Sequence, residues 1–194
     1  MNAGAPVLVI VAAVFVGCTA GAQEWSKNWD IAIWVSGSTG EELTNSFGES
    51  QLRSAGVYVG RALTRDIGPR WWHGRIEYGL NLFPAFAQSR PQLIYGSGIE
   101  PVVLCWNSSL AIRGLQPYAE IAGGALRTTS NLPSGDTSAF NFTAKGGGGL
   151  YIPLSKNHFM DFGVRWSHIS NANLGRRNPE FNGIEVRIGY HWRR

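Results

Sequence analysis

The sequence has little of what most soluble enzymes and helical membrane proteins contain. Beyond its N-terminal segment, it has no apolar run of the roughly 18 residues that a membrane-spanning helix requires. Charged residues form only 15% of the chain, and its net charge of +4 is too weak a bias to indicate nucleic-acid binding. There are two cysteines, Cys18 and Cys105. These absences argue against a helical membrane protein and a disulfide-stabilised scaffold.

The N-terminus has the pattern of a removable export signal. Its apolar run, from Val7 to Gly17, is too short to span a bilayer, and Ala20 and Ala22 form an A-x-A cleavage site before Gln23. We therefore expect a signal peptide at 1–22 and one domain at 23–194. The alternative is lipidation at Cys18. After cleavage at residue 22, only Cys105 would remain, and its predicted role is packing.

Glycine (25 residues) and aromatic residues (12%) are abundant, and apolar and polar positions alternate along most of the chain. Alternation with a period of two is typical of strands that differ in environment on their two faces. Pro101 interrupts one segment and predicts a β-bulge or an edge irregularity there. Eight strands are expected, at 30–35, 52–64, 72–82, 92–106, 115–127 and 140–145, and in two segments flanking a polar loop within 159–192.

The connections between these segments alternate in length. Turns near 66–69, 107–114 and 153–157 are short, whereas 38–50, 128–137 and 173–182 are longer and polar. This asymmetry predicts an all-β fold, an eight-stranded antiparallel transmembrane β-barrel of the outer-membrane type. Tryptophans near strand ends would form its interfacial girdles, namely Trp25, Trp29, Trp71, Trp106, Trp166 and Trp192.

Charged residues recur on the face opposite the apolar one. Four cations and four anions share it, and they could pair inside a narrow barrel: Arg75, Glu77, Glu120, Lys145, Asp161, Arg165, Glu185 and Arg187. The alternative is a soluble, lipocalin-like barrel with an apolar interior. Periodicity alone does not separate the two, but the charge balance and the signal peptide favour the membrane barrel.

Chemistry is suggested at the end of the seventh segment, where His168 and Ser170 share one strand face with Met160, Phe162 and Trp166. A serine hydroxyl becomes a nucleophile when a base removes its proton, and an acid usually orients that base. His168 and Ser170 supply the first two roles. Glu180 and Glu185 are the candidates for the third. The apolar surroundings suit a lipid substrate.

The run His168-Ile169-Ser170-Asn171-Ala172, with Asn182-Gly183-Ile184-Glu185 after the loop, resembles the lipid A 3-O-deacylase (PagL-type) family of outer-membrane barrels. The resemblance covers roughly residues 159–190. It implies a carboxylic ester hydrolase with a Ser-His-Glu triad, in which Ser170 is the nucleophile, His168 the base and Glu185 the acid. It also implies a place for Asn171 in the oxyanion hole.

The alternation of side chains along a strand (strand parity) restricts which residue can serve as the acid. Glu185 alternates with Ile184 and Val186, so a regular strand would turn it into the barrel, away from His168. We therefore predict a β-bulge near Gly183 that re-aims it. Without one, Glu185 belongs to the interior ion pairs. Glu180, in the loop, remains the alternative acid.

The resemblance implies lipid A or lipopolysaccharide as substrate, cleaved at the 3-position with release of a 3-hydroxy fatty acid, and requires no cofactor. Arg176 and Arg177 are candidate ligands of its phosphates. With periplasmic termini, the seventh strand ends at the cell surface, which places the site at the outer leaflet of a bacterial outer membrane. The histidines His73, His158 and His191 form no metal pattern. The oligomeric state is left open.

Three other functions remain open at this point. One is a non-enzymatic barrel for adhesion or envelope integrity. Another is an outer-membrane phospholipase or acyltransferase. The third, a soluble lipid-binding barrel, follows only if the inside and outside of the barrel are reversed.

Overall fold

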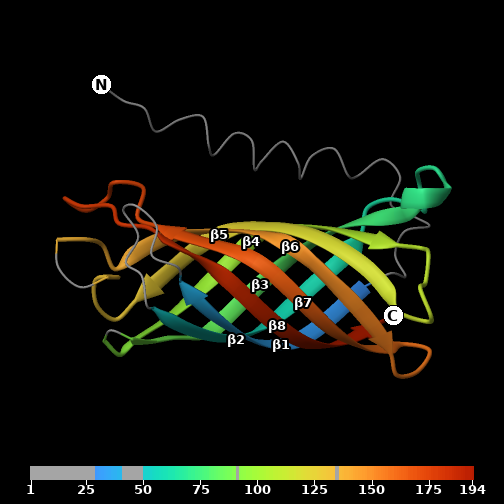
Figure 1. Cartoon of the computed structure of the whole chain (residues 1–194), viewed down its shortest axis with the longest axis horizontal. Coiled ribbons are helices and arrows are strands. Elements are labelled where there is room, and N and C mark those ends of the chain that lie inside the picture. Colours follow the sequence, from blue (N-terminus) through green and yellow to red (C-terminus); the bar gives the residue numbers. More distant parts are fainter. Residues whose placement is uncertain (1–28, 41–49, 91, 134–135) are drawn as a thin grey trace.

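A computed structural model describes residues 29–40, 50–90, 92–133 and 136–194 as a closed antiparallel barrel. Each strand pairs with the next in sequence, and β1 pairs with β8 (Figure 1). The expected fold class is thereby confirmed. The signal peptide, the lipidation site Cys18 and the girdle residue Trp25 lie outside the described residues. The strands are β1 (Trp29–Gly40), β2 (Gln51–Ala62), β3 (Gly74–Arg90), β4 (Ile94–Ser108), β5 (Gln116–Thr128), β6 (Phe140–Pro153), β7 (His158–Ser170) and β8 (Phe181–Arg193).

The outer face of the barrel is apolar. On β1, Ile33 and Val35 are 63% and 57% exposed, while the intervening Trp34 is buried. The same alternation runs along β7 and β8. This orientation is the one expected of a barrel in lipid, and it excludes the lipocalin-like arrangement. Separately, no helix among the described residues is long and apolar enough to cross a membrane.

Ion pairs fill much of the interior. Lys145 Nζ lies 2.9 Å from Glu185 and 3.2 Å from Glu100, and Arg187 lies 3.2 Å from Asp161. Further along, Asp30 accepts a hydrogen bond from Arg193 at 2.9 Å. Most of the buried charges are thus paired, as the sequence predicted, and the network provides a polar core. The buried Glu77 has no ion pair among the described residues and instead accepts hydrogen bonds from Tyr58 and Asn107.

At the end of the barrel that carries the β7–β8 loop, the interior becomes apolar. A buried cluster packs there, including Leu52, Ile94, Leu126, Ile169 and Phe181. Ile169 and Phe181 face one another across β7 and β8, at the last and first positions of their pairing. This packing anchors the strand ends on which His168, Ser170 and Asn182 stand.

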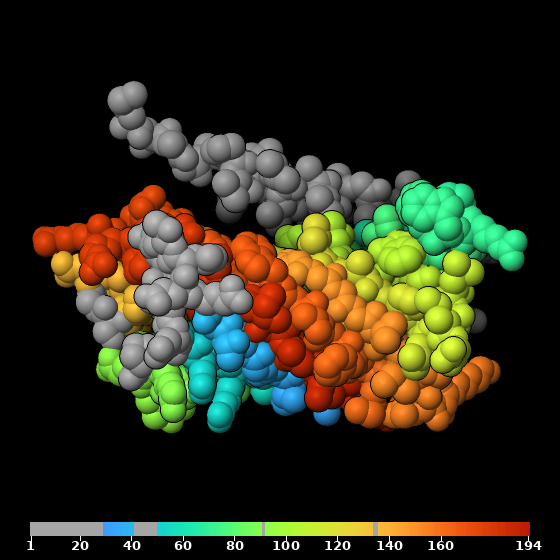
Figure 2. Space-filling model, in the orientation of Figure 1, coloured from blue at the N-terminus to red at the C-terminus, as the bar shows by residue number. Residues whose placement is uncertain are grey.

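The strand irregularities and strand ends agree only partly with those predicted from the sequence. The pairing of β4 with β5 shifts between Ile99 and Val102, so the irregularity predicted at Pro101 is confirmed. The expected strand through Trp72 is wrong at its start, because Arg70–Trp72 forms a 3-10 helix (η1) and β3 begins at Gly74. Figure 2 shows this turn at the opposite end of the barrel from the β7–β8 loop.

Candidate active site

His168 and Ser170 lie on the outer face at the end of β7, and both are half-buried. The Nε2 atom of His168 is 3.1 Å from the Oγ atom of Ser170, within hydrogen-bonding distance. The regular alternation of β7 produces this contact, because residues two apart project from the same face. The predicted pairing of base and nucleophile is therefore present in the geometry.

The second ring nitrogen of His168 faces Asn182. Its Nδ1 atom lies 2.8 Å from Asn182 Oδ1, and the two residues are direct cross-strand partners in the β7–β8 register. Because an amide oxygen only accepts hydrogen bonds, this contact requires the proton on Nδ1. Nε2 is then unprotonated and can accept the hydroxyl proton of Ser170, as a general base must.

The structure does not bring Glu185, the predicted acid of the triad, into contact with His168, whose side-chain partners are Asn182 and Ser170. Pairing between β7 and β8 runs without a register shift from His158 to Ile169, and the bulge predicted near Gly183 is absent. Strand parity consequently turns Glu185 inward, where it is 3% exposed. There it binds Arg165 at 3.1 Å and Lys145 at 2.9 Å. In this structure Glu185 belongs to the interior ion-pair network, and its catalytic role stays a prediction.

Glu180, the alternative acid, is half-buried immediately before β8, and its side chain has no hydrogen bond or ion pair with the described part of the chain. The sequence motif contains Asn182 but gives it no role, because a carboxylate is expected as the third member of a triad. The signal that could have found it is parity. Asn182 shares the outer face of β8 with Ile184 and Val186, and Glu185 does not.

Asn171 is buried at 1% exposure and directed into the loop that follows β7. Its Nδ2 atom donates to the carbonyl oxygen of Arg177 at 2.8 Å, and its backbone N–H donates to Asn178 Oδ1 at 2.9 Å. These bonds hold the loop against the strand end. The next two residues, Ala172 and Asn173, have positive φ angles of 49° and 64°, which turn the chain sharply beside Ser170.

Arg176 and Arg177 are exposed in this loop. The backbone N–H of Arg177 donates to the carbonyl oxygen of Asp136 at 2.9 Å, which links the β7–β8 loop to the β5–β6 loop. The loop is thus tied at Asn171 and at Arg177, while both guanidinium groups remain accessible.

Aromatic and apolar side chains surround the histidine and serine. The indole of Trp166 stacks on the His168 ring, with centroids 5.6 Å apart and planes at 20°. On the neighbouring strand, Phe142 pairs with Ser170 and is 42% exposed. On the other side lies Ile184, 46% exposed. The polar side chains of Ser170, His168 and Asn182 are therefore surrounded by apolar ones.

Among the residues with described positions, no group of three His, Cys, Asp or Glu side chains converges as a metal site would require.

Comparison with known proteins identifies one family. The family model described as lipid A 3-O-deacylase (PagL) matches residues 56–191, about two thirds of the chain. No curated protein sequence matches at a significant level. The crystal structure of the outer membrane enzyme PagL superposes with a TM-score of 0.59 at 14% identity, covering 82% of this chain and 97% of that one. Neisserial surface protein A (NspA) gives 0.55 at 12% identity, with 86% and 97% covered. At these identities the structural likeness concerns the fold alone.

Proposed function

The chain belongs to the lipid A 3-O-deacylase (PagL) family, and from this premise we propose that it hydrolyses an ester-linked acyl chain of lipid A in the bacterial outer membrane. The proposed bond is the ester at the 3-position, and the proposed product is a 3-hydroxy fatty acid. The observation that carries the proposal is the hydrogen-bonded series Ser170–His168–Asn182 on the lipid-facing wall.

In the proposed reaction, Ser170 Oγ attacks the ester carbonyl while His168 Nε2 takes the hydroxyl proton. The tetrahedral intermediate collapses to an acyl-enzyme, and His168 returns its proton to the departing sugar hydroxyl. Water, deprotonated by the same imidazole, then attacks the acyl-enzyme. The fatty acid leaves, and the proton returns to Ser170. Asn182 is the positioning residue, since its amide oxygen fixes the tautomer and the orientation of the ring.

The oxyanion role expected for Asn171 stays a proposal. A developing negative charge needs donors aimed at the carbonyl oxygen, and Asn171 stands next to the nucleophile. One hydrogen of its Nδ2 group is held by Arg177, which leaves the second for such a task. The exposed side chains of Arg176 and Arg177 are proposed to meet lipid A phosphates, because guanidinium groups bind phosphate in a bidentate manner.

The proposed location is the outer leaflet, with the site facing lipid laterally. Two features support it. Trp166, Phe142 and Ile184 give the surroundings of the site an apolar surface that acyl chains can contact. With the N-terminal end of β1 in the periplasm, every odd-numbered strand runs outward, so the end of β7 lies at the surface where lipopolysaccharide resides.

Mass spectrometry of lipid A provides the test. Purified protein in detergent should release one 3-hydroxy fatty acid per lipid A, and Ser170→Ala and His168→Ala should abolish this release. Ser97→Ala is the matched control, because Ser97 is also exposed on the barrel wall and lies on β4, away from the site. Equal release by Ser170→Ala and wild type would contradict the mechanism.

Two outcomes would favour the other functions considered above. Release of acyl chains from phospholipid in preference to lipid A would indicate a phospholipase. No release from either lipid by folded protein would indicate a non-enzymatic barrel.

A further inference from the structure

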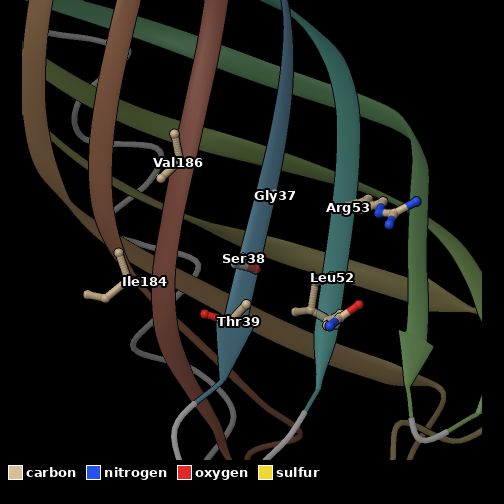
Figure 3. Close-up of a pocket in the computed structure, with 8 residues that line it drawn as sticks. Gly37, Ser38, Thr39, Leu52, Arg53, Ile184 and Val186 are labelled. Carbon is tan, nitrogen blue, oxygen red and sulfur yellow. The ribbon is translucent and has the colours of Figure 1, made fainter.

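A groove of about 290 Å³ lies on the outer wall of the barrel, across β8, β1 and β2 (Figure 3). Ile184 and Val186 border it on β8, Gly37 and Thr39 lie along its middle on β1, and Arg53 borders it on β2. Gly37 is the direct partner of Val186 on one side and of Arg53 on the other. The groove exists because the central position of this row has no side chain.

Backbone packing does not require glycine at this position. A Cβ atom added to Gly37 would meet only the carbonyl oxygen of Leu52, at 4.0 Å, an ordinary contact. At Gly183, by contrast, an added Cβ would lie 3.0 Å from the Cα of Gly40 and closer still to other atoms. The hollow at Gly37 is thus free space on the lipid-facing surface, available to a ligand.

The groove combines an apolar wall with a cation. Ile184 and Val186 are 46% and 40% exposed and form its apolar side. Arg53 is exposed on the opposite side, and no carboxylate of the described residues forms an ion pair with it. An arginine facing outward near the end of a barrel strand suits an anionic headgroup at the membrane interface. Figure 3 shows the Arg53 side chain extending from β2 away from Gly37, so the apolar hollow suits an acyl chain and the cation at its β2 edge suits a phosphate.

The groove also adjoins the candidate active site. Ile184 and Asn182 belong to the same outward row of β8, two residues apart, which is about 7 Å along a strand. A single amphiphile could therefore contact His168 and Ser170 and still extend over β1 and β2.

We propose that this groove is a substrate subsite, in which an acyl chain of lipid A lies over Gly37 against Ile184 and Val186 while Arg53 binds a phosphate of the same molecule. This inference rests on the proposed function, since it takes lipid A as the substrate. It also specifies the direction in which the substrate lies on the barrel wall. The substrate extends from Ser170 towards β8, β1 and β2.

Binding measured without turnover tests the subsite separately from the reaction. In the Ser170→Ala background, native mass spectrometry in detergent would compare the binding of lipid A to Gly37→Leu and Arg53→Gln. We expect each change to weaken binding about tenfold, through lost apolar contact and a lost charge-assisted hydrogen bond respectively. With dephosphorylated lipid A, Arg53→Gln should have no effect, while Gly37→Leu should still weaken binding.

Matched controls lie on the other side of the site. Gly123 on β5 is similarly open, with an added Cβ 3.8 Å from Thr143 O, and Arg127 on β5 is an exposed arginine near the same barrel end. Gly123→Leu and Arg127→Gln should bind lipid A as the parent does. Gly37→Ala, which adds only the tolerated Cβ, serves if the leucine variant fails to fold, and should weaken binding by a smaller factor.

The proposal is overturned if folded Gly37→Leu binds lipid A normally, or if Gly123→Leu weakens binding equally. It is also overturned if Arg53→Gln affects phosphorylated and dephosphorylated lipid A alike. Absence of acyl release by the wild-type protein would instead count against the proposed function, because the binding comparison uses protein that lacks the nucleophile.

Discussion

The amide oxygen of Asn182 lies 2.8 Å from Nδ1 of His168, in the place that a carboxylate occupies in most serine hydrolase triads. An amide can fix the tautomer and the ring plane, as in the Cys-His-Asn arrangement of papain-like proteases. It carries no negative charge, however, and so stabilises the imidazolium less than a carboxylate does. The arrangement predicts a base that is well oriented by a neutral partner.

Two replacements of Asn182 separate the orientation of the His168 ring from the stabilisation of its positive charge. Asn182→Ala should lower kcat about tenfold, because the hydrogen bond that orients the ring is lost. Asn182→Asp should retain the orientation and add a charge. A carboxylate favours the protonated imidazole, so the acidic limb of the pH–rate profile should move to higher pH. The measurement is kcat against pH for acyl release. An unchanged profile in both variants would remove Asn182 from the mechanism.

Glu185 should matter for stability and not for the chemistry. Glu185→Gln leaves Lys145 and Arg165 with less compensation inside the barrel, and breaking a buried pair costs about 3 kcal/mol of unfolding free energy. Urea unfolding in lipid vesicles would measure this loss. Glu180→Gln is the control, because Glu180 is half-buried and its removal should cost less than about 0.5 kcal/mol. Acyl release per folded molecule should remain within about twofold of wild type for both variants. A loss of turnover confined to Glu185→Gln would instead support its role as the acid of the triad.

The fold could be predicted from the sequence because its main determinants are local. Alternation at Ile31, Ile33 and Val35 or at Ile184 and Val186 specifies which face meets lipid, and Pro101 marks an irregularity wherever the strand lies. The contact of His168 with Ser170 is local for the same reason, since both stand on one strand.

The third member of the site could not be predicted with the same means. Which residue of β8 faces His168 depends on the register between two strands joined by a ten-residue connection, 171–180. A shift of one residue exchanges Asn182 for a neighbour on the opposite face. The motif indicates Glu185, whereas the parity of β8 puts Asn182 on the face of His168, and the regular β7–β8 pairing agrees with parity.

The last prediction concerns Trp166, which stacks on His168. Its indole can stabilise a positive charge on the imidazole ring, and the neutral amide of Asn182 does so only weakly. An aromatic face attracts a cation that approaches its ring, by about 0.5–2 kcal/mol. In the proposed reaction His168 takes the proton of Ser170, and the imidazolium would then lie against the indole, whose ring centroid is 5.6 Å from that of His168. Trp166→Leu should therefore lower kcat about tenfold and move the acidic limb of the pH–rate profile to lower pH, with Trp166→Phe intermediate.

A change in KM alone, with kcat and the pH profile untouched, would mean that the indole serves only as lipid contact. Trp192→Leu is the control, since Trp192 is similarly exposed near the other end of β8. A double variant that combines Trp166→Leu with Asn182→Asp provides a stricter test. A carboxylate at position 182 supplies the missing negative charge, so the double variant should lose less from the tryptophan replacement than the Asn182 protein does. Strictly additive losses would show that the indole does not act through the charge of His168.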